Sequence, residues 1–292
     1  MVGARRGRAR IGLFIGVATI LLWTLLPFYW MLATSLAPQR SLIHFPINLY
    51  PHNLDLSRFR VIFFGAGLDL PGIDVAGVAA EFRHGLVNSL LIASTTSVIG
   101  LLLGGLAGYA FARLRFRLRR PMLLLAICIQ MLPPIATVIP LYFMLSHLGL
   151  LNSRPGLIVV YCANSVVYVL WLMSTYYRSI PLELEEAARV DGCTRFGALL
   201  RVVLPLARPG LVATGLLVFI TAWNEFTYAL ILVNDPVAKT APVLLTEFST
   251  QFQIDYGMTM TAATLVALPP VLLAFIFQRY IVRGLTAGAV KG

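Results

Sequence analysis

Glutamate, alanine and glycine recur at close spacing in one stretch of this 292-residue chain, residues 180–205. The stretch is long for an internal loop and mixes acidic and basic residues with small ones at Ala187, Ala188 and Gly192. Small side chains let a partner surface come close. The pattern therefore predicts a docking element for another protein.

A second polar group lies inside an apolar stretch and comprises Trp223, Asn224, Glu225 and Tyr228. A charge within a membrane span is costly unless it is paired or lines water. Aromatic rings stack on sugar rings, and amide and carboxylate groups hydrogen-bond to hydroxyls, so the group would suit a sugar pathway. Hydrogen bonds from Asn224 and Glu225 to neighbouring helices would explain the same residues equally well, and the sequence leaves both interpretations open.

Neither group is accompanied by a pattern typical of catalysis. The sequence contains no HExxH, Gly-x-Ser-x-Gly or P-loop motif, and its four histidines are scattered. Cys128, Cys162 and Cys193 have no metal-like spacing. We therefore predict no catalytic residue and no metal site, and a membrane-embedded enzyme is disfavoured.

The elements that position these residues are predicted to be membrane helices. Hydrophobic residues make up 59% of the chain and charged residues 12%, about half the charged share of a soluble domain. Six stretches reach the ~20 apolar residues that a crossing helix needs: 11–33, 86–112, 122–146, 156–177, 210–233 and 260–282. A buried core helix could mimic one of them but not six in succession. We predict an all-α membrane protein with six transmembrane helices in a single domain, residues 1–292.

Basic residues are distributed unevenly among the connections. With the N-terminus inside, the inner segments hold 17 of the 23 Lys and Arg residues, which predicts that both termini and the stretch 180–205 are cytoplasmic and that 34–85 is an outer loop. Most of the net charge of +11 reflects this bias. The basic run 113–120 is expected to meet anionic lipid headgroups rather than nucleic acid. The first span could be a signal peptide, but its long apolar run favours an uncleaved helix.

Local signals predict two short helices and a turn within 180–205. Pro181 suits the first turn of the first helix, and the glutamates after it suit the positive end of the helix dipole. Asp191-Gly192 supplies the break, and Thr194 can cap the second helix. The expected apolar faces are Leu184, Ala187 and Ala188 on the first helix, and Phe196, Leu199, Leu200 and Val203 on the second.

Glycine and proline predict how the spans pack. Gly100, Gly104 and Gly108 lie on one face of the second span, where another helix can approach closely. The third span contains Pro133, Pro134 and Pro140 and should be bent or locally unwound. In the outer loop, residues 56–64 could form a short interfacial helix with its phenylalanines toward lipid, and a plain covering loop is the alternative.

The stretch 180–205 resembles the EAA loop of ABC importer permeases. The matching features are Glu186-Ala187-Ala188, Gly192 three residues later, and Val202 and Leu204-Pro205 beyond it, with Val202 where the family usually has isoleucine. The resemblance implies a pair of coupling helices that fit a cleft on a separate ATPase. It assigns Glu186 and Asp191 as polar contacts to the ATPase and Gly192 as the turn.

The resemblance narrows to the carbohydrate-uptake subclass and covers essentially the whole chain. The segments FPINLYPHNL (45–54), AWNEFTYAL (222–230) and GLTAGAVKG (284–292) are similar to MalG-like, maltose-type permeases. This implies a heterodimer with a second permease, two ATPase subunits and an extracytoplasmic solute-binding protein, which Lys239, Glu247, Gln251 and Gln253 could contact. It also implies a C-terminal tail that reaches the ATPase, through Gly288, Lys291 and Gly292.

We therefore expect a multi-pass permease of a prokaryotic cell membrane that moves a sugar or oligosaccharide by alternating access. ATP and Mg²⁺ are expected at the partner ATPase, and no cofactor on this chain. A permease for a non-sugar solute, such as glycerol phosphate or a polyol, is the alternative. A stand-alone secondary transporter is less favoured, because it needs an intramembrane ion site and only one acid lies within a predicted span.

Overall fold

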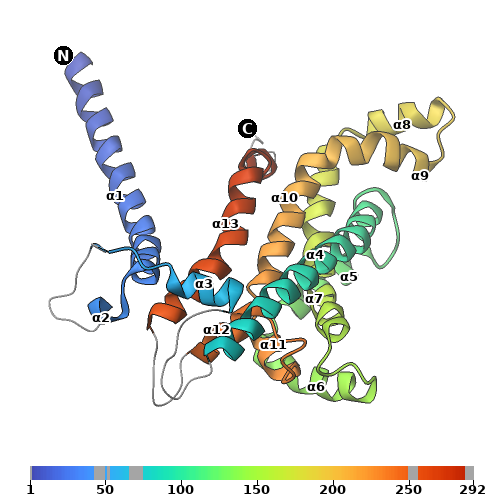
Figure 1. Cartoon of the computed structure of the whole chain (residues 1–292). Coiled ribbons are helices and arrows are strands. Elements are labelled where there is room, and N and C mark those ends of the chain that lie inside the picture. The colour runs from blue at the N-terminus through green and yellow to red at the C-terminus, as the bar shows by residue number, and fades with distance from the viewer. Residues whose placement is uncertain (1, 43–49, 51–52, 66–74, 249–255, 287–292) are drawn as a thin grey trace. The chain divides into compact units, whose positions relative to one another are not determined.

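The computed structural model describes residues 2–42, 50, 53–65, 75–248 and 256–286, and these residues form helices and connections without strands (Figure 1). The long helices are α1 (Val2–Leu36), α4 (Val75–Arg113), α7 (Arg154–Ser179), α10 (Leu204–Trp223) and α13 (Tyr256–Thr286). The shorter ones are α2 (Gln39–Leu42), α3 (Ser57–Phe64), α5 (Arg119–Gln130), α6 (Pro134–His147), α8 (Leu182–Val190), α9 (Arg195–Ala198), α11 (Thr227–Leu232) and α12 (Ala241–Leu245). A π-helical turn, Leu199–Val203, joins α9 to α10, and a 3₁₀ turn, Thr246–Phe248, follows α12.

Within the described residues, five helices are long and apolar enough to cross a membrane, and the bent pair α5–α6 makes a sixth if its halves form one span. The all-helical prediction is confirmed. Five of the six predicted spans fall on one of these helices or on the bent pair, and the predicted span 210–233 extends beyond the end of α10. Helix α4 begins at Val75, inside the predicted outer loop 34–85. The first turns of α4 are rich in alanine, which favours helix. The single domain over 1–292 stays a prediction, as the chain forms two compact units.

The first unit comprises Met1–Phe82 and Leu245–Ala267. In it the apolar side chains of α1 are exposed, with Phe14 at 79% and Trp23 at 81%, as expected for a helix that faces lipid or another protein. The predicted helix at 56–64 is present as α3, and Phe64 is 80% exposed.

A buried arginine secures the end of α1. Arg58 is 2% exposed, and its Nη1 donates to the carbonyls of Ala37 at 2.7 Å and Ser35 at 3.4 Å. A cation at a helix C-terminus is favourable because the last carbonyls carry partial negative charge. Nearby, hydrogen bonds from the side chain and backbone of Ser57 hold the pKa of the Asp55 carboxyl below its ordinary value.

The second unit comprises Arg83–Leu244 and Leu268–Gly292, and glycines bring two of its helices together. A Cβ built on Gly104 would lie 2.6 Å from Val169 Cβ, and one on Gly108 would lie 3.0 Å from Met173 Cβ. A Cβ on Gly100 would lie 2.8 Å from Ser165 Oγ. All three neighbours belong to α7, so the predicted seam is confirmed and its partner is the fourth span.

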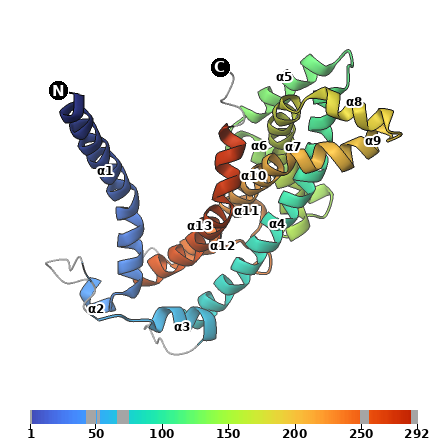
Figure 2. The ribbon, with the colours of Figure 1, turned by 90° about the horizontal axis from the view of Figure 1, so that it is seen from above.

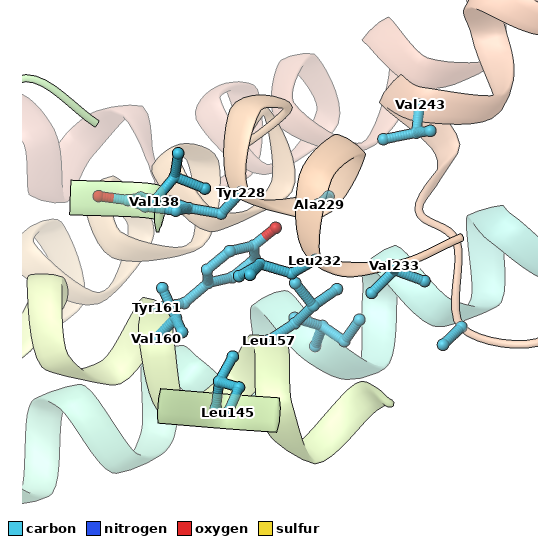
Figure 3. Close-up of a cluster of buried hydrophobic side chains, with 12 residues drawn as sticks. Val138, Leu145, Leu157, Val160, Tyr161, Tyr228, Ala229, Leu232, Val233 and Val243 are labelled. Atoms are coloured by element: carbon cyan, nitrogen blue, oxygen red, sulfur yellow. The ribbon is translucent and has the colours of Figure 1, made fainter. Parts of the chain in front are cut away.

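The third and fifth spans of this unit are interrupted. Helices α5 and α6 meet at 98°, with the break between Gln130 and Pro134, as the prolines predicted, since proline lacks the amide donor that would continue a helix. The predicted span 210–233 is also broken, because α10 ends at Trp223 and α11 begins at Thr227. Around α11, apolar side chains from α6 and α7 form a buried cluster that includes Leu145, Leu157 and Leu232 (Figure 3).

Candidate functional sites

The stretch 180–205 forms a hairpin of two short helices, with the turn where the sequence predicts it. Asp191 follows the last residue of α8, and Gly192 has φ +90°, a left-handed conformation that glycine adopts without strain. The Thr194 hydroxyl accepts a hydrogen bond from the backbone N–H of Gly197 at 3.1 Å and so caps α9. Helices α8 and α9 lie side by side, and Figure 2 shows the pair extending away from the other helices of its unit.

The residues predicted to dock are mostly on the outside of this hairpin. Glu186, Ala187, Asp191, Gly192 and Pro205 are exposed, Leu204 is half-buried, and Ala188 is buried at 8%. Two large apolar side chains of the hairpin are exposed as well: Val190 at 87% and Phe196 at 61%. These exposed apolar side chains lie beside charged ones, and the docking role of the hairpin stays a prediction.

The predicted apolar faces of the two helices are partly wrong. Leu184 and Ala187 are exposed, and Glu185 takes their expected place beside Ala188 in the interior. On the second helix Leu199 and Val203 are buried, while Phe196 and Leu200 are exposed. Leu199 and Val203 are buried because they pack into an apolar cluster with Tyr109 of α4 and Tyr177 of α7, which Phe196 and Leu200 do not join.

Sequence reasoning did not single out Glu185. Its Oε1 accepts a hydrogen bond from the Tyr109 hydroxyl, and its Oε2 lies 3.1 Å from Arg113 Nε. Both partners belong to the last turns of α4. Nothing in the local sequence distinguishes Glu185 from Glu183 or Glu186. The signal that could have found it is a tyrosine and an arginine one helical turn apart at the C-terminal end of α4, the second span.

At the other end of this unit, Glu225 occupies the break between α10 and α11. Its Oε1 accepts from the Tyr228 N–H at 2.8 Å, and its Oε2 accepts from the Ala229 N–H at 3.1 Å. The Tyr161 hydroxyl of α7 donates to Oε2 at 2.6 Å, and Figure 3 shows Tyr161 beneath the helix that carries Tyr228 and Ala229. The carboxylate thus satisfies amides at the start of α11, where the helix dipole favours a negative charge.

A cavity of about 400 Å³ lies beside this break. Glu225 and Tyr228 line it. The second, third, fourth and fifth spans add polar side chains, which are in that order Thr96, Gln130, Asn164 with Ser165, and Thr221. Tyr161 and Tyr168 add aromatic rings. Hydroxyl, amide and carboxylate groups beside aromatic rings are the chemistry that binds a polyhydroxylated ligand.

The other two members of the predicted polar group lie elsewhere. Trp223 is 2% exposed and stacks on Phe219, with ring centroids 5.7 Å apart, in an apolar cluster. Asn224 follows the last residue of α10 and is exposed, and neither residue lines the cavity. Because the helix breaks at this point, the four residues do not share one helix face.

A polar network fixes the connection between α11 and α12. Asn88 Nδ2 donates to the carbonyls of Val237 and Lys239, each at 2.9 Å. Asn152 Oδ1 accepts from the N–H of Asn234 at 2.7 Å. This connection contains Lys239, one of the residues predicted to meet a binding protein, whereas Gln251, Gln253 and the tail residues Gly288, Lys291 and Gly292 lie outside the described residues.

Comparison with known families decides what kind of protein has this architecture. Residues 100–287 match the family described as the binding-protein-dependent transport system inner membrane component. The chain belongs to this family. It is accordingly a multi-pass membrane protein and a transport component, and the match covers the hairpin and every residue that lines the cavity except Thr96.

Individual relatives in this family align over nearly the full chain. The chain is 38% identical over 272 residues to the trehalose transport system permease protein SugB of Mycobacterium tuberculosis, covering 92% of this chain and 93% of that one. It is 34% identical over 284 residues to the trehalose/maltose transport system permease protein MalG of Thermococcus litoralis, covering 97% of each. A bacterial ABC transporter structure involved in alginate import has the same fold, with a TM-score of 0.76, 22% identity and coverage of 92% and 95%.

Proposed function

We propose that this chain is a permease subunit of an ATP-driven importer that moves a sugar or oligosaccharide across the cell membrane. The observation that carries the proposal is the hairpin α8–α9, whose exposed Glu186, Asp191 and Val190 form a surface beyond the transmembrane helices. The family match and the relatives named for trehalose and maltose transport support it.

In this proposal the hairpin is the docking site of a separate ATPase on the cytoplasmic side, with both termini on that side. The basic residues of the inner connections support the orientation. A second permease, two ATPase subunits and an extracytoplasmic binding protein complete the complex, and ATP with Mg²⁺ binds the ATPase. Lys239 and Glu247 are proposed to meet the binding protein, and the tail with Gly288, Lys291 and Gly292 to meet the ATPase.

The docking role is tested by changing the exposed surface while leaving the interior intact. Glu186→Lys reverses a charge on the proposed contact, and Glu183→Lys, on the same exposed helix, is the matched control. Gly192→Ala tests the turn, since a Cβ there meets no atom within 4 Å but φ is +90°, which strains any side chain. ATP-driven sugar uptake should be lost with Glu186→Lys and with Gly192→Ala, while the amount of chain in the membrane is unchanged.

Full ATP-dependent uptake in both variants would refute docking through the hairpin. Uptake by the purified chain in liposomes without any ATPase would instead support a stand-alone transporter. A panel of sugars, polyols and glycerol phosphate, offered as uptake substrates to the assembled transporter, separates the sugar proposal from its non-sugar alternative.

The cavity beside Glu225 is proposed as part of the solute pathway of this chain. Its polar and aromatic lining supports a sugar, and Glu225 is placed by its hydrogen bonds to Tyr161 and α11. Thr221→Trp would fill the cavity, whereas Leu217→Trp, one turn away on α10 and not part of the lining, is the control. The first variant should reduce sugar uptake with ATP hydrolysis retained, and equal uptake in the two variants would contradict the proposal.

A further inference from the structure

Glu185 carries a buried carboxylate on an otherwise exposed helix. Its side chain is 5% exposed, whereas Glu183 and Glu186 on either side of it are exposed. Burying a carboxylate is unfavourable unless a cation and hydrogen-bond donors replace the lost water. Tyr109 and Arg113 of helix α4, which lie 76 and 72 positions before Glu185 in the sequence, supply both.

The two carboxylate oxygens of Glu185 contact different side chains of α4. Tyr109 donates its hydroxyl to Oε1, and Arg113 Nε lies 3.1 Å from Oε2. The arginine side chain is itself only 9% exposed, and the contact is an ion pair rather than an aligned hydrogen bond. The attraction between the two charges is strong here because little water screens it.

Arg113 and Tyr109 also hold the segment that leads into α8. Arg113 Nη2 donates to the carbonyl of Ile180 at 2.8 Å, directly before α8 begins. The Tyr109 ring packs edge-on against Tyr177 near the end of α7, with centroids 5.9 Å apart. The last turns of α4 therefore contact α8, its leading segment and α7 at once.

These contacts resist any separation of α8 from α4. Pulling the hairpin away would leave the Glu185 carboxylate and the Arg113 guanidinium without each other in a poorly hydrated place. A smaller cost is incurred when both helices move together, since the buried contacts persist. Close packing at Gly104 and Gly108 would pass the same movement from α4 to α7.

We infer that Glu185 is a positioning residue that makes α8 and the inner end of α4 move as one body, through its contacts with Tyr109 and Arg113. A displacement of the hairpin by the ATPase thereby reaches the transmembrane helices. The inference rests on the proposed docking role of the hairpin. In this inference the exposed Glu186 contacts the ATPase, and the buried Glu185 passes the movement of the hairpin to α4.

The rival explanation is that these three residues only stabilise the fold. The two explanations differ in the number of solute molecules transported per ATP hydrolysed. A purely structural contact alters how much transporter is assembled but leaves this ratio unchanged in the molecules that do assemble. A transmitting contact alters the ratio itself.

The test uses the whole transporter, with its ATPase and binding protein, in proteoliposomes. Glu185→Gln removes the charge but keeps the shape, and Tyr109→Phe removes one hydrogen bond and keeps the ion pair. Glu183→Gln is the matched control. ATP hydrolysis and solute uptake are measured on the same vesicles.

Glu185→Gln should lower the ratio of solute to ATP at least about fivefold, with the KM for ATP unchanged, and Tyr109→Phe should lower it less. Glu183→Gln should leave it unchanged. An unchanged ratio in Glu185→Gln and Tyr109→Phe would overturn the inference, and Tyr109→Phe alone decides if Glu185→Gln does not assemble. If Glu186→Lys uncouples transport and these variants do not, only this inference fails; if Glu186→Lys has no effect either, the docking proposal fails.

A distance measurement tests the rigid-body claim without altering the contact. Spin labels are placed on α8 at Leu182→Cys and on α4 at Leu106→Cys, both exposed positions outside the proposed docking surface, with the three native cysteines replaced by serine. The distance between the labels should be the same in nucleotide-free and ATP-bound transporter, and it should differ between the two states when Glu185→Gln is added. If the distance changes between the two states while Glu185 is still present, α8 and α4 move separately and the inference is wrong.

Discussion

The glycine seam between α4 and α7 can be tested by adding a single methyl group. In Gly104→Ala the new Cβ would lie 2.6 Å from Val169 Cβ and 2.8 Å from the carbonyl oxygen of Val166. Non-bonded carbon atoms favour separations of about 3.5–4.0 Å, so the two helices would have to separate by roughly 1 Å. The neighbouring position provides the control, because a Cβ on Gly105 would have its nearest contact, the Tyr177 hydroxyl, at 3.8 Å.

The expected destabilisation follows from two opposing effects. Overpacking a close-packed interior costs about 1–3 kcal/mol. Replacing glycine by alanine within a helix recovers at most about 1 kcal/mol, and this gain applies to Gly104 and Gly105 alike. The free energy of unfolding should therefore be about 1–3 kcal/mol lower for Gly104→Ala than for Gly105→Ala.

The buried thiol of Cys162 on α7 offers a direct assay. With Cys128 and Cys193 replaced by serine, the reaction of Cys162 with a thiol-specific fluorophore reports the melting of this helix. Each kcal/mol should lower the Tm by roughly 2–4 °C in a chain of this size. Equal Tm values for Gly104→Ala and Gly105→Ala would refute the reasoning, because the two variants differ only in what the methyl group meets.

Three further predictions concern single polar contacts. Tyr161→Phe removes the hydroxyl that donates to Glu225 and should cost about 1.5–3 kcal/mol of stability, measured as a lower Tm than that of Tyr168→Phe, at another ring that lines the cavity. Arg58→Ala should lower the Tm clearly, because it removes the cation from the end of α1 and leaves a buried site empty. Arg60→Ala, at an exposed position, should change the Tm little. Equal Tm shifts in the two variants would contradict the capping role of Arg58. Thr194→Ala removes the cap of α9 and should destabilise the hairpin by about 0.5–2 kcal/mol, measured as faster cleavage of the hairpin by protease. Thr194→Ser keeps a capping hydroxyl and should restore most of the lost stability.

The sequence by itself determined the features that depend on neighbouring residues. Apolar runs of about 20 residues mark membrane spans whatever surrounds them, so five of the six predicted spans fall on a long helix or on the bent pair α5–α6. The bend in the third span follows from Pro133 and Pro134, which cannot donate the amide bonds that a continuous helix needs. The turn of the hairpin follows from Gly192, and its second helix from the cap at Thr194, because both effects act within a few residues.

Only the tertiary structure decided which polar groups are buried and what they contact. Three glutamates lie close together in α8, and Glu185 is the buried one because Tyr109 and Arg113, distant in sequence, lie against that side of the helix. The break in the fifth span lacks a proline, and Glu225 satisfies the start of α11 there with help from Tyr161, 64 positions away. The spacing of apolar residues predicts where a helix forms. Which charged side chain is buried depends on the oppositely charged and hydrogen-bonding residues that folding brings next to it. Composition and spacing therefore predicted the membrane helices and the two-helix hairpin at 180–205, while the contacts between that hairpin and α4 became visible only when the helices were packed.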